Sequence, residues 1–359
     1  MSIFRLITLV FSFCLSDLRG ETIQTFYGPL EVEEPVLLEL IHSPAFERLQ
    51  HIHQYGVAYY TKTHTEEYTR YAHSLGVFAL LRTKNASLEE QISGLLHDVS
   101  HTAFSHVGDW VFAIENQEED YQSAIHDTYL INSGIEKILN RHGFSGEQIS
   151  PKRKEFTMLE QPLPNLCADR IDYNIQGAYF QKFITFEEAQ KIFLDLSFQE
   201  GKWILKQHDL AAKLVSFSLF MTKNCWGSAA NYITSKWLAE TILQGIKIGI
   251  ISWPEFQSGI DQDVWDRLSA TQDPFIATRM HMLHFPDLYY RLVNPLKAQL
   301  FIPFKCRGID PWINQDGKII RLTSIYPELE EALQNVRKQS IEGWPVQMSF
   351  LENNLQENS

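Results

Sequence analysis

The most regular pattern of apolar and polar residues in the chain lies between residues 87 and 109. Ser87 is followed three residues later by Glu90, the spacing of a capping box that begins a helix by satisfying backbone N–H groups. Apolar residues then recur at the spacing of a buried helix face: Ile92, Leu95, Leu96 and Val99. The pattern predicts a helix whose buried stripe ends at His97 and Asp98.

The same periodicity predicts a mostly α-helical chain. Helices are expected at residues 35–41, 44–52, 70–81, 186–196, 213–248 and 327–338, and one or two helices at 123–140. A further helix is expected to begin at a cap on Asn165 and to run through residue 175. Residues 21–30 are expected to be extended with a turn at Gly28-Pro29, residues 55–60 to be a strand or a loop, and residues 61–69 to be a loop. After residue 300, apolar residues alternate around Gly308 and Gly317, which predicts short strands.

These elements suggest one large helical unit with additions at both ends. We expect a helical catalytic core at residues 21–299, a small α+β module at 300–345 and a polar tail at 346–359. Residues 1–20 combine one early positive charge, an apolar run and a polar end, as in a secretory signal peptide, although no Ala-x-Ala site closes them. Export is therefore slightly favoured, with a cytoplasmic location as the alternative. No other stretch approaches transmembrane length.

Composition narrows the classes of partner. The chain has 359 residues with 44% hydrophobic and 21% charged residues, as in ordinary globular proteins. Its 31 Lys and Arg against 44 Asp and Glu give a net charge of −13, which argues against broad nucleic-acid binding. A small anionic substrate is still compatible with a local basic pocket. The four cysteines, at positions 14, 167, 225 and 306, form no Cys-x-x-Cys pair, so free thiols are expected.

A cluster of metal-capable residues follows the central helix. A single histidine at a helix end is usually a solvated or capping residue, but ionisable groups on a buried stripe are costly unless they have a function. Four residues on three predicted helices offer nitrogen and oxygen donors: His73, His97, Asp98 and Asp169. Such donors suit Mn, Fe, Mg or Zn, and four ligands leave open positions for water and substrate. The sequence therefore predicts a catalytic divalent-metal site.

Three linked motifs extend this prediction. They are Arg70-x-x-His73-Ser-Leu-Gly-Val, His97-Asp98-x-x-His101-x4-His106-x-x-Asp109 and Ala168-Asp169-Arg170-Ile171-Asp172-Tyr173. Together they resemble the HD-domain metal-dependent phosphohydrolases, and most of all the branch of deoxynucleoside-triphosphate triphosphohydrolases. Weaker matches are Ser43-Pro-x-Phe-x-Arg48-Leu, Asp310-Pro-Trp and Arg321-Leu, so the resemblance covers residues 24–340. It implies an HD-domain helical bundle with a small C-terminal α+β module.

The resemblance also implies a role for each matching residue. The metal would be held by His73, His97, Asp98 and Asp169. The cleavage site would be lined by His101, His106, Asp109 and His126, and the substrate contacted by Gln54, Arg70, Arg170, Tyr173 and Lys223. His106 paired with Asp109 would donate a proton to the leaving oxygen, and Tyr173 would reject a 2′-hydroxyl. These roles match phosphoryl transfer, which depends on charge neutralisation and alignment.

Two departures from the family pattern qualify the prediction. His126 is followed by Asp127 where better-known members have Glu, and the guanine-reading positions of nucleotide-activated members hold His42, Glu47 and Gln50. Activation by GTP is therefore not expected, whereas a dimer or tetramer is implied by the resemblance alone. The leading hypothesis is hydrolysis of a deoxynucleoside triphosphate to nucleoside and triphosphate. Two alternatives stay open: a phosphatase or phosphodiesterase for another nucleotide or phosphoester, and a non-catalytic nucleotide-binding regulator.

Overall fold

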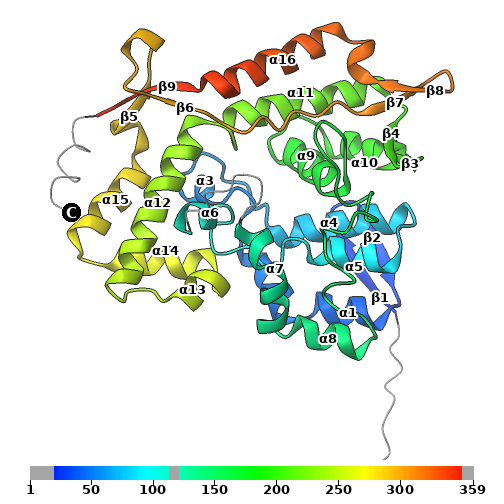
Figure 1. Cartoon of the computed structure of the whole chain (residues 1–359), viewed down its shortest axis with the longest axis horizontal. Coiled ribbons are helices and arrows are strands. Elements are labelled where there is room, and N and C mark those ends of the chain that lie inside the picture. The colour runs from blue at the N-terminus through cyan, green and yellow to red at the C-terminus, as the bar shows by residue number, and fades with distance from the viewer. Residues whose placement is uncertain (1–19, 113–120, 350–359) are drawn as a thin grey trace, which may run out of the picture.

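The computed structural model describes residues 20–112 and 121–349. The expected signal peptide and most of the polar tail lie outside these residues. The described part is mostly helical, as the sequence predicts, with sixteen α-helices and nine short strands (Figure 1). None of the described helices has the length and apolar character needed to cross a membrane. The three described cysteines are free thiols, as expected: Cys167, Cys225 and Cys306.

The first elements form a hairpin and a group of helices. They are β1 (Glu21–Thr25), β2 (Gly28–Val32), α1 (Pro35–Ile41), α2 (Pro44–Glu47), η1 (Arg48–His51), α3 (Val57–Tyr60), α4 (Arg70–Thr83) and α5 (Leu88–Leu96). The helices expected at 35–41 and 70–81 are confirmed, while the one expected at 44–52 divides into an α-helical and a 3₁₀ turn. The hairpin turn lies at Phe26-Tyr27 and not at Gly28-Pro29, because Gly28 already pairs with Thr25.

One local prediction in this region was wrong, and another was only partly right. Residues 57–60 form a helical turn where a strand or loop was expected. Tertiary contacts fix this turn, because the ring of Tyr60 packs on Phe104 and Trp265. The capping box of α5 is only half formed: Ser87 Oγ accepts the Glu90 backbone N–H, but the Glu90 carboxylate is turned inward. It accepts the backbone N–H groups of residues 158 and 159 instead and so ties α5 to the loop before α9.

The remaining helices build the rest of the molecule. They are α6 (Val107–Val111), α7 (Tyr121–Asn132), α8 (Ile135–Arg141), α9 (Ala168–Phe180), α10 (Phe186–Asp195), α11 (His208–Asn224), α12 (Ala229–Lys247), α13 (Trp253–Ser258), α14 (Asp261–Ala270), α15 (Pro274–His284) and α16 (Pro327–Glu342). The single helix expected at 213–248 is two helices, because Cys225 leaves the helical conformation and Ser228 caps α12. Asn165 does not cap α9, since its side-chain oxygen accepts a hydrogen bond from Arg321.

The strands expected after residue 300 are present and join two small sheets. The strands not yet named are β3 (Ser197–Gln199), β4 (Lys202–Leu205), β5 (Tyr290–Leu292), β6 (Leu300–Ile302), β7 (Trp312–Gln315), β8 (Lys318–Arg321) and β9 (Trp344–Met348). One sheet has the order β3-β4-β7-β8, with β4 and β7 parallel, and the other has the order β5-β9-β6. The chain therefore runs from β6 to β7 beside α11, as Figure 1 shows. We call residues 303–311 the connecting strap.

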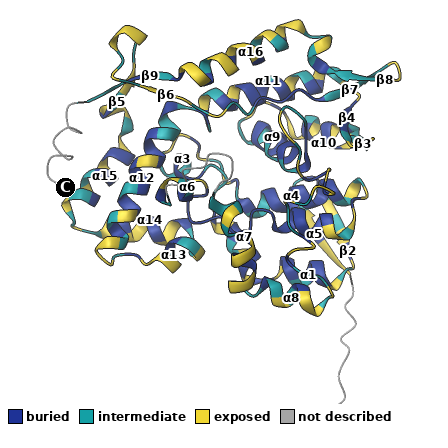
Figure 2. Cartoon of the chain, viewed as in Figure 1, coloured by how far each residue is buried: buried dark blue, intermediate teal, exposed yellow. Residues whose placement is uncertain are grey.

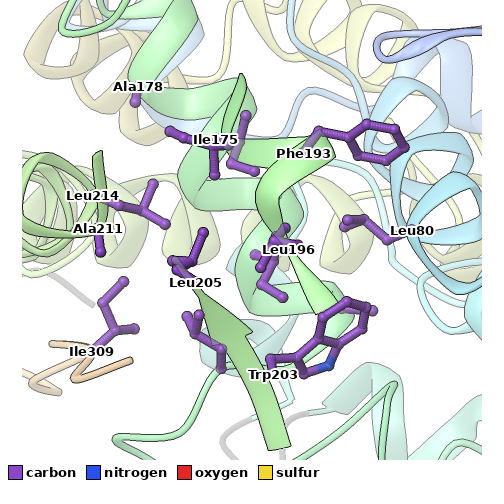
Figure 3. Packing of buried hydrophobic residues seen from close by; sticks show 14 of the residues in the cluster. Leu80, Ile175, Ala178, Phe193, Leu196, Trp203, Leu205, Ala211, Leu214 and Ile309 are labelled. Atoms are coloured by element: carbon purple, nitrogen blue, oxygen red, sulfur yellow. The ribbon is translucent and has the colours of Figure 1, made fainter. Parts of the chain in front are cut away.

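One apolar cluster fixes the helices that carry the predicted site. It brings Leu80 of α4, Ile175 of α9 and Leu214 of α11 together with Trp203 of β4 and Ile309 of the strap (Figure 3). Each of these side chains is almost completely buried, and burial of such a side chain stabilises the fold by about 1.5–3 kcal/mol. Helices α4, α5 and α9 are accordingly buried over most of their length (Figure 2). Polar side chains on these helices are thus held on a rigid support.

Candidate metal centre and the adjoining cavity

Three side chains from three elements converge at the centre of the molecule. His73 lies on α4, His97 follows the last residue of α5, and Asp169 is in the first turn of α9. The two histidine Nε2 atoms are 3.2 Å apart, and Asp169 Oδ1 lies 2.9 Å from His73 Nε2 and 3.5 Å from His97 Nε2. Among the residues that the structure describes, this trio forms a compact group of possible metal-ligand atoms.

The other ring nitrogen of each histidine is held by a hydrogen bond. His97 Nδ1 lies 2.8 Å from the Gly94 carbonyl, which can only accept, so this nitrogen carries the proton. His73 Nδ1 lies 2.7 Å from Oδ2 of Asp172, a fully buried carboxylate that also accepts from the Tyr27 hydroxyl. Both rings therefore direct Nε2 toward Asp169. Anchoring of this kind fixes the tautomer and orientation of histidines that bind metals.

The electrostatics of the trio fit a cation. Burial disfavours a charged His73, yet hydrogen bonds with Asp169 and Asp172 raise its pKa to about 10. Lone pairs of His97 Nε2 and Asp169 Oδ1 point at His73 Nε2, and a proton on His73 Nε2 offsets their mutual repulsion. A divalent ion would satisfy the same lone pairs, and two imidazole nitrogens with one carboxylate oxygen suit borderline and hard divalent metals. The residues present therefore fit the metal that the sequence predicts.

Asp98, the fourth predicted ligand, is engaged in a buried ion pair. Its carboxylate oxygens lie 3.6 Å from the Nε2 atoms of His73 and His97, but Oδ2 is only 2.5 Å from Arg70 Nη1. Burial favours the neutral acid, but the Arg70 guanidinium outweighs it and holds the pKa of Asp98 well below its usual value. Arg70 also donates from Nε to Ser105 Oγ, at 2.9 Å. Arg70, predicted to neutralise a phosphate, is thus already paired with Asp98.

A cavity of about 370 Å³ opens next to the trio. Nine of the predicted site residues line it: Gln54, Arg70, His97, Asp98, His101, His106, Asp169, Arg170 and Tyr173. His73 is completely buried, and its Nε2 meets His97 and Asp169, which do line the cavity. The fold therefore brings most of the predicted site residues, which are far apart in the sequence, to one cavity.

Two histidines with different surroundings follow the trio along this cavity. His101 is buried with Nε2 3.3 Å from Asp98 Oδ1, and burial together with the Arg70 charge lowers its pKa to about 4. It is therefore neutral near pH 7. The His106 ring lies 5.0 Å away, is about half exposed and has Nδ1 at 3.1 Å from Asp109 Oδ2. This His106–Asp109 pair is the arrangement expected of a proton donor, with the carboxylate orienting the imidazole.

His126 lies on the other side of His97. It lines a second cavity of about 400 Å³ together with His97 and the basic run Lys152-Arg153-Lys154. His126 Nε2 donates to the Leu96 carbonyl at 3.0 Å, and burial lowers the pKa of this histidine. The structure thus places His126 next to His97, in a different cavity from His101 and His106.

Two predicted substrate contacts are placed differently from the rest. The Arg170 guanidinium lines the cavity but donates to the backbone carbonyls of Gln161 and Asn165, so it also holds the loop before α9. Lys223, in the last turn of α11, is not among the lining residues of either cavity. Of the predicted substrate contacts that line the cavity, Arg70 is in an ion pair and Arg170 is bonded to that loop. Gln54 and Tyr173 line the cavity without either kind of contact.

Several lining residues were missed by sequence reasoning. Trp226, between α11 and α12, meets Tyr173 edge to face at a ring distance of 5.5 Å, and Tyr55 and Tyr68 line the same cavity. Arg307 lines the same cavity from the strap. No local motif marks these residues, because only the folded chain brings the strap and the α11–α12 connection to α9. Asp172 was visible in its motif, but its bond to His73 was not.

Comparisons with known proteins agree with this geometry. No family model matches the chain. It is 33% identical over 316 residues to the uncharacterised protein YdhJ of Bacillus subtilis, covering 87% of this chain and 95% of that one. It is 32% identical over 254 residues to the metal-dependent phosphohydrolase cns2 of Cordyceps militaris, covering 69% and 72% respectively.

More distant similarities point the same way. The deoxynucleoside triphosphate triphosphohydrolase SAMHD1 of Danio rerio is 27% identical over 197 residues, covering 48% of this chain and 31% of that protein. A crystal structure of a phosphohydrolase from Bacteroides thetaiotaomicron superposes with a TM-score of 0.65 at 15% identity, covering 92% of this chain and 99% of that one, and so has the same fold. With its donor trio and these relatives, the chain belongs to the HD-type metal-dependent phosphohydrolases.

Proposed function

We propose that the protein hydrolyses deoxynucleoside triphosphates to a deoxynucleoside and inorganic triphosphate. The observation that carries this proposal is the cavity itself, in which three of the four predicted metal ligands (His97, Asp98 and Asp169) and the aromatic pair Tyr173 and Trp226 line one space. A flat base fits beside aromatic rings, and a phosphate fits beside a cation. Support also comes from relatives named as deoxynucleoside triphosphate triphosphohydrolases.

We assign the metal ligands on the distances between their donor atoms. His73, His97 and Asp169 would hold the ion, and Asp98 would join them only by sharing its carboxylate with Arg70. A bound divalent ion would polarise a phosphoryl oxygen and lower the pKa of a nearby water. Arg70 keeps Asp98 ionised and therefore available to a cation. Its Nε bond to Ser105 fixes the guanidinium, so we assign Arg70 a positioning role and no direct phosphate contact.

The two cavity histidines have different parts in this proposal. His101 is buried beside Asp98 with its pKa lowered to about 4, so its neutral imidazole is a weak base and would align the attacking water by a hydrogen bond, while the proton of that water would pass to solvent. His106, oriented by Asp109, would donate a proton to the 5′-oxygen of the leaving nucleoside. The bond between phosphorus and that oxygen breaks as water adds to phosphorus. The products are the free 5′-hydroxyl and triphosphate.

Specificity would be set on the aromatic side of the cavity. Tyr173 occupies the first turns of α9 and is fixed by the edge-to-face contact with Trp226. A rigid ring at this place would leave no room for a 2′-hydroxyl, which favours the deoxyribose form. Gln54, whose Oε1 is buried and has no hydrogen-bond partner among the described residues, would receive a hydrogen bond from the sugar.

A product assay tests this proposal. The purified chain is incubated under anaerobic conditions with Mn²⁺ and the four deoxynucleoside triphosphates, their ribose counterparts or a generic phosphate ester. The variants His97→Ala and Asp98→Ala serve as inactive controls. Release of deoxynucleoside and triphosphate by the wild type alone supports the proposal. Release of orthophosphate would assign a phosphatase, and no product despite bound metal would favour a non-catalytic nucleotide-binding protein.

A further inference from the structure

The cavity needs a cation that its predicted residues do not supply. A substrate with several phosphates carries more negative charge than one divalent ion neutralises. Of the two predicted arginines that line the cavity, Arg70 is paired with Asp98, and Arg170 is bonded to backbone carbonyls. The Asp169 carboxylate adds negative charge to the same walls. A further positive group must therefore face a polyphosphate if one binds here.

Arg307 has the position and the electrostatics for this role. It lines the cavity from the connecting strap and is partly buried. Within residues 20–112 and 121–349, no hydrogen bond or ion pair is formed by its guanidinium. Its charge also reaches Tyr173, whose pKa is raised by burial and lowered in part by Arg170 and Arg307. Arg307 lines the same cavity as His97 and Asp169 of the trio, and the Tyr173 ring beside it lies 6.5 Å from that of His73.

The backbone of the strap is held firmly on both sides of Arg307. The Arg307 carbonyl accepts from Ser218 Oγ of α11 at 3.1 Å. The next residue, Gly308, packs so closely that an added Cβ would lie 2.5 Å from Leu333 Cδ2 of α16. Before Arg307, Phe304 stacks on Trp344 of β9. Because the backbone that carries Arg307 is already fixed, binding of an anion does not have to order this segment. The lower entropic cost strengthens binding.

We propose that Arg307 binds the phosphate groups of the substrate that lie beyond the cleaved bond, and so selects a polyphosphate over a monophosphate. This inference rests on the proposed function and names the residue that recognises the anionic end of the substrate. The planar guanidinium offers two parallel N–H donors to phosphate oxygens, which suits it better than an ammonium group. It also gives the strap, which lies outside the helices of the donor trio, a direct part in substrate binding.

Two measurements on the full chain test this inference. Titration calorimetry with inorganic triphosphate at saturating Mn²⁺ compares the wild type with Arg307→Ala and Arg307→Lys. Loss of a hydrogen-bonded charge should weaken triphosphate binding about tenfold to a hundredfold in Arg307→Ala, and Arg307→Lys should recover part of it. Steady-state kinetics should show a similar rise in KM for the deoxynucleoside triphosphate, with kcat changed less than about twofold.

The control is Arg291→Ala, which removes an exposed arginine of β5 that contacts Gln347 and does not line the cavity. It should leave both measurements unchanged. Weaker triphosphate binding by Arg307→Ala, in a chain that hydrolyses no deoxynucleoside triphosphate, would support the inference while refuting the proposed function. Turnover of these nucleotides with equal KM and triphosphate affinity in wild type and Arg307→Ala would overturn the inference. A wild type that binds no triphosphate would overturn it as well.

Discussion

Replacing Asp172 by Asn should weaken metal binding although Asp172 is not placed among the metal ligands. Asp172 is completely buried, and its Oδ2 lies 2.7 Å from His73 Nδ1. The carboxylate fixes the orientation of the His73 ring and raises the basicity of its Nε2, which makes this nitrogen a stronger metal ligand. Removing such a partner typically lowers metal affinity or activity tenfold to a hundredfold, or by about 1.4–2.7 kcal/mol. Asn keeps the size and one acceptor oxygen, so the main change is the lost negative charge.

Competition between the protein and a chelating dye for Mn²⁺ measures this effect directly. Asp209→Asn is the matched control, because Asp209 is an α11 residue that accepts a hydrogen bond from the Tyr326 hydroxyl and does not line the cavity. Asp172→Asn should show a Kd raised about tenfold to a hundredfold, with activity partly restored by excess metal. Circular dichroism would confirm that both variants are folded. An unchanged Kd in folded Asp172→Asn would refute the assigned role of Asp172.

Three further predictions follow from particular contacts. Gly76→Ala should reproduce the metal-binding defect of Asp172→Asn in the same dye titration, because an added Cβ would lie 1.9 Å from Asp172 Oδ1; a normal affinity would show that the carboxylate tolerates displacement. His106→Gln should lower kcat about a hundredfold to ten-thousandfold while metal content measured by atomic absorption stays normal, and a full kcat would remove His106 as the proton donor. Burial raises the pKa of Asp261 to about 7, so the folded chain retains a proton that the unfolded chain releases near pH 4. The contribution of this carboxyl to stability should therefore decrease as pH rises from 5 to 7, by about 2–3 kcal/mol relative to Asp261→Asn in urea unfolding, and a pH-independent difference would contradict it.

The sequence predicted the helices that carry the trio because their signals are local. The helix over α4 and the stripe that ends at His97 follow from apolar spacing alone, and both are present. The grouping of His73, His97 and Asp169 came from residue chemistry and from the family resemblance. The distances between their donor atoms then required the fold, since His73 and Asp169 are 96 positions apart in the sequence.

Features decided by long-range contacts escaped prediction. Glu90 has the spacing of a capping box, but two backbone N–H groups near residue 158 compete for its carboxylate. Arg70 has the position of a phosphate contact in its motif, but the folded chain places Asp98 within 2.5 Å of it. Arg307 carries no signal of its own, because its role depends on a strap that crosses from one small sheet to the other. In each case the neighbouring residues that decide the role are distant in sequence, and local periodicity contains no information about them.

We propose that His73, His97 and Asp169 hold the ion on which activity depends. The most direct test is a crystal structure of the Mn²⁺-loaded protein, with anomalous scattering recorded near the manganese absorption edge. One strong peak is expected within bonding distance, about 2.0–2.3 Å, of both Nε2 atoms and an Asp169 oxygen. The peak should be absent from His97→Ala. An active, metal-loaded protein with no peak between these three side chains would refute this assignment of the metal ligands.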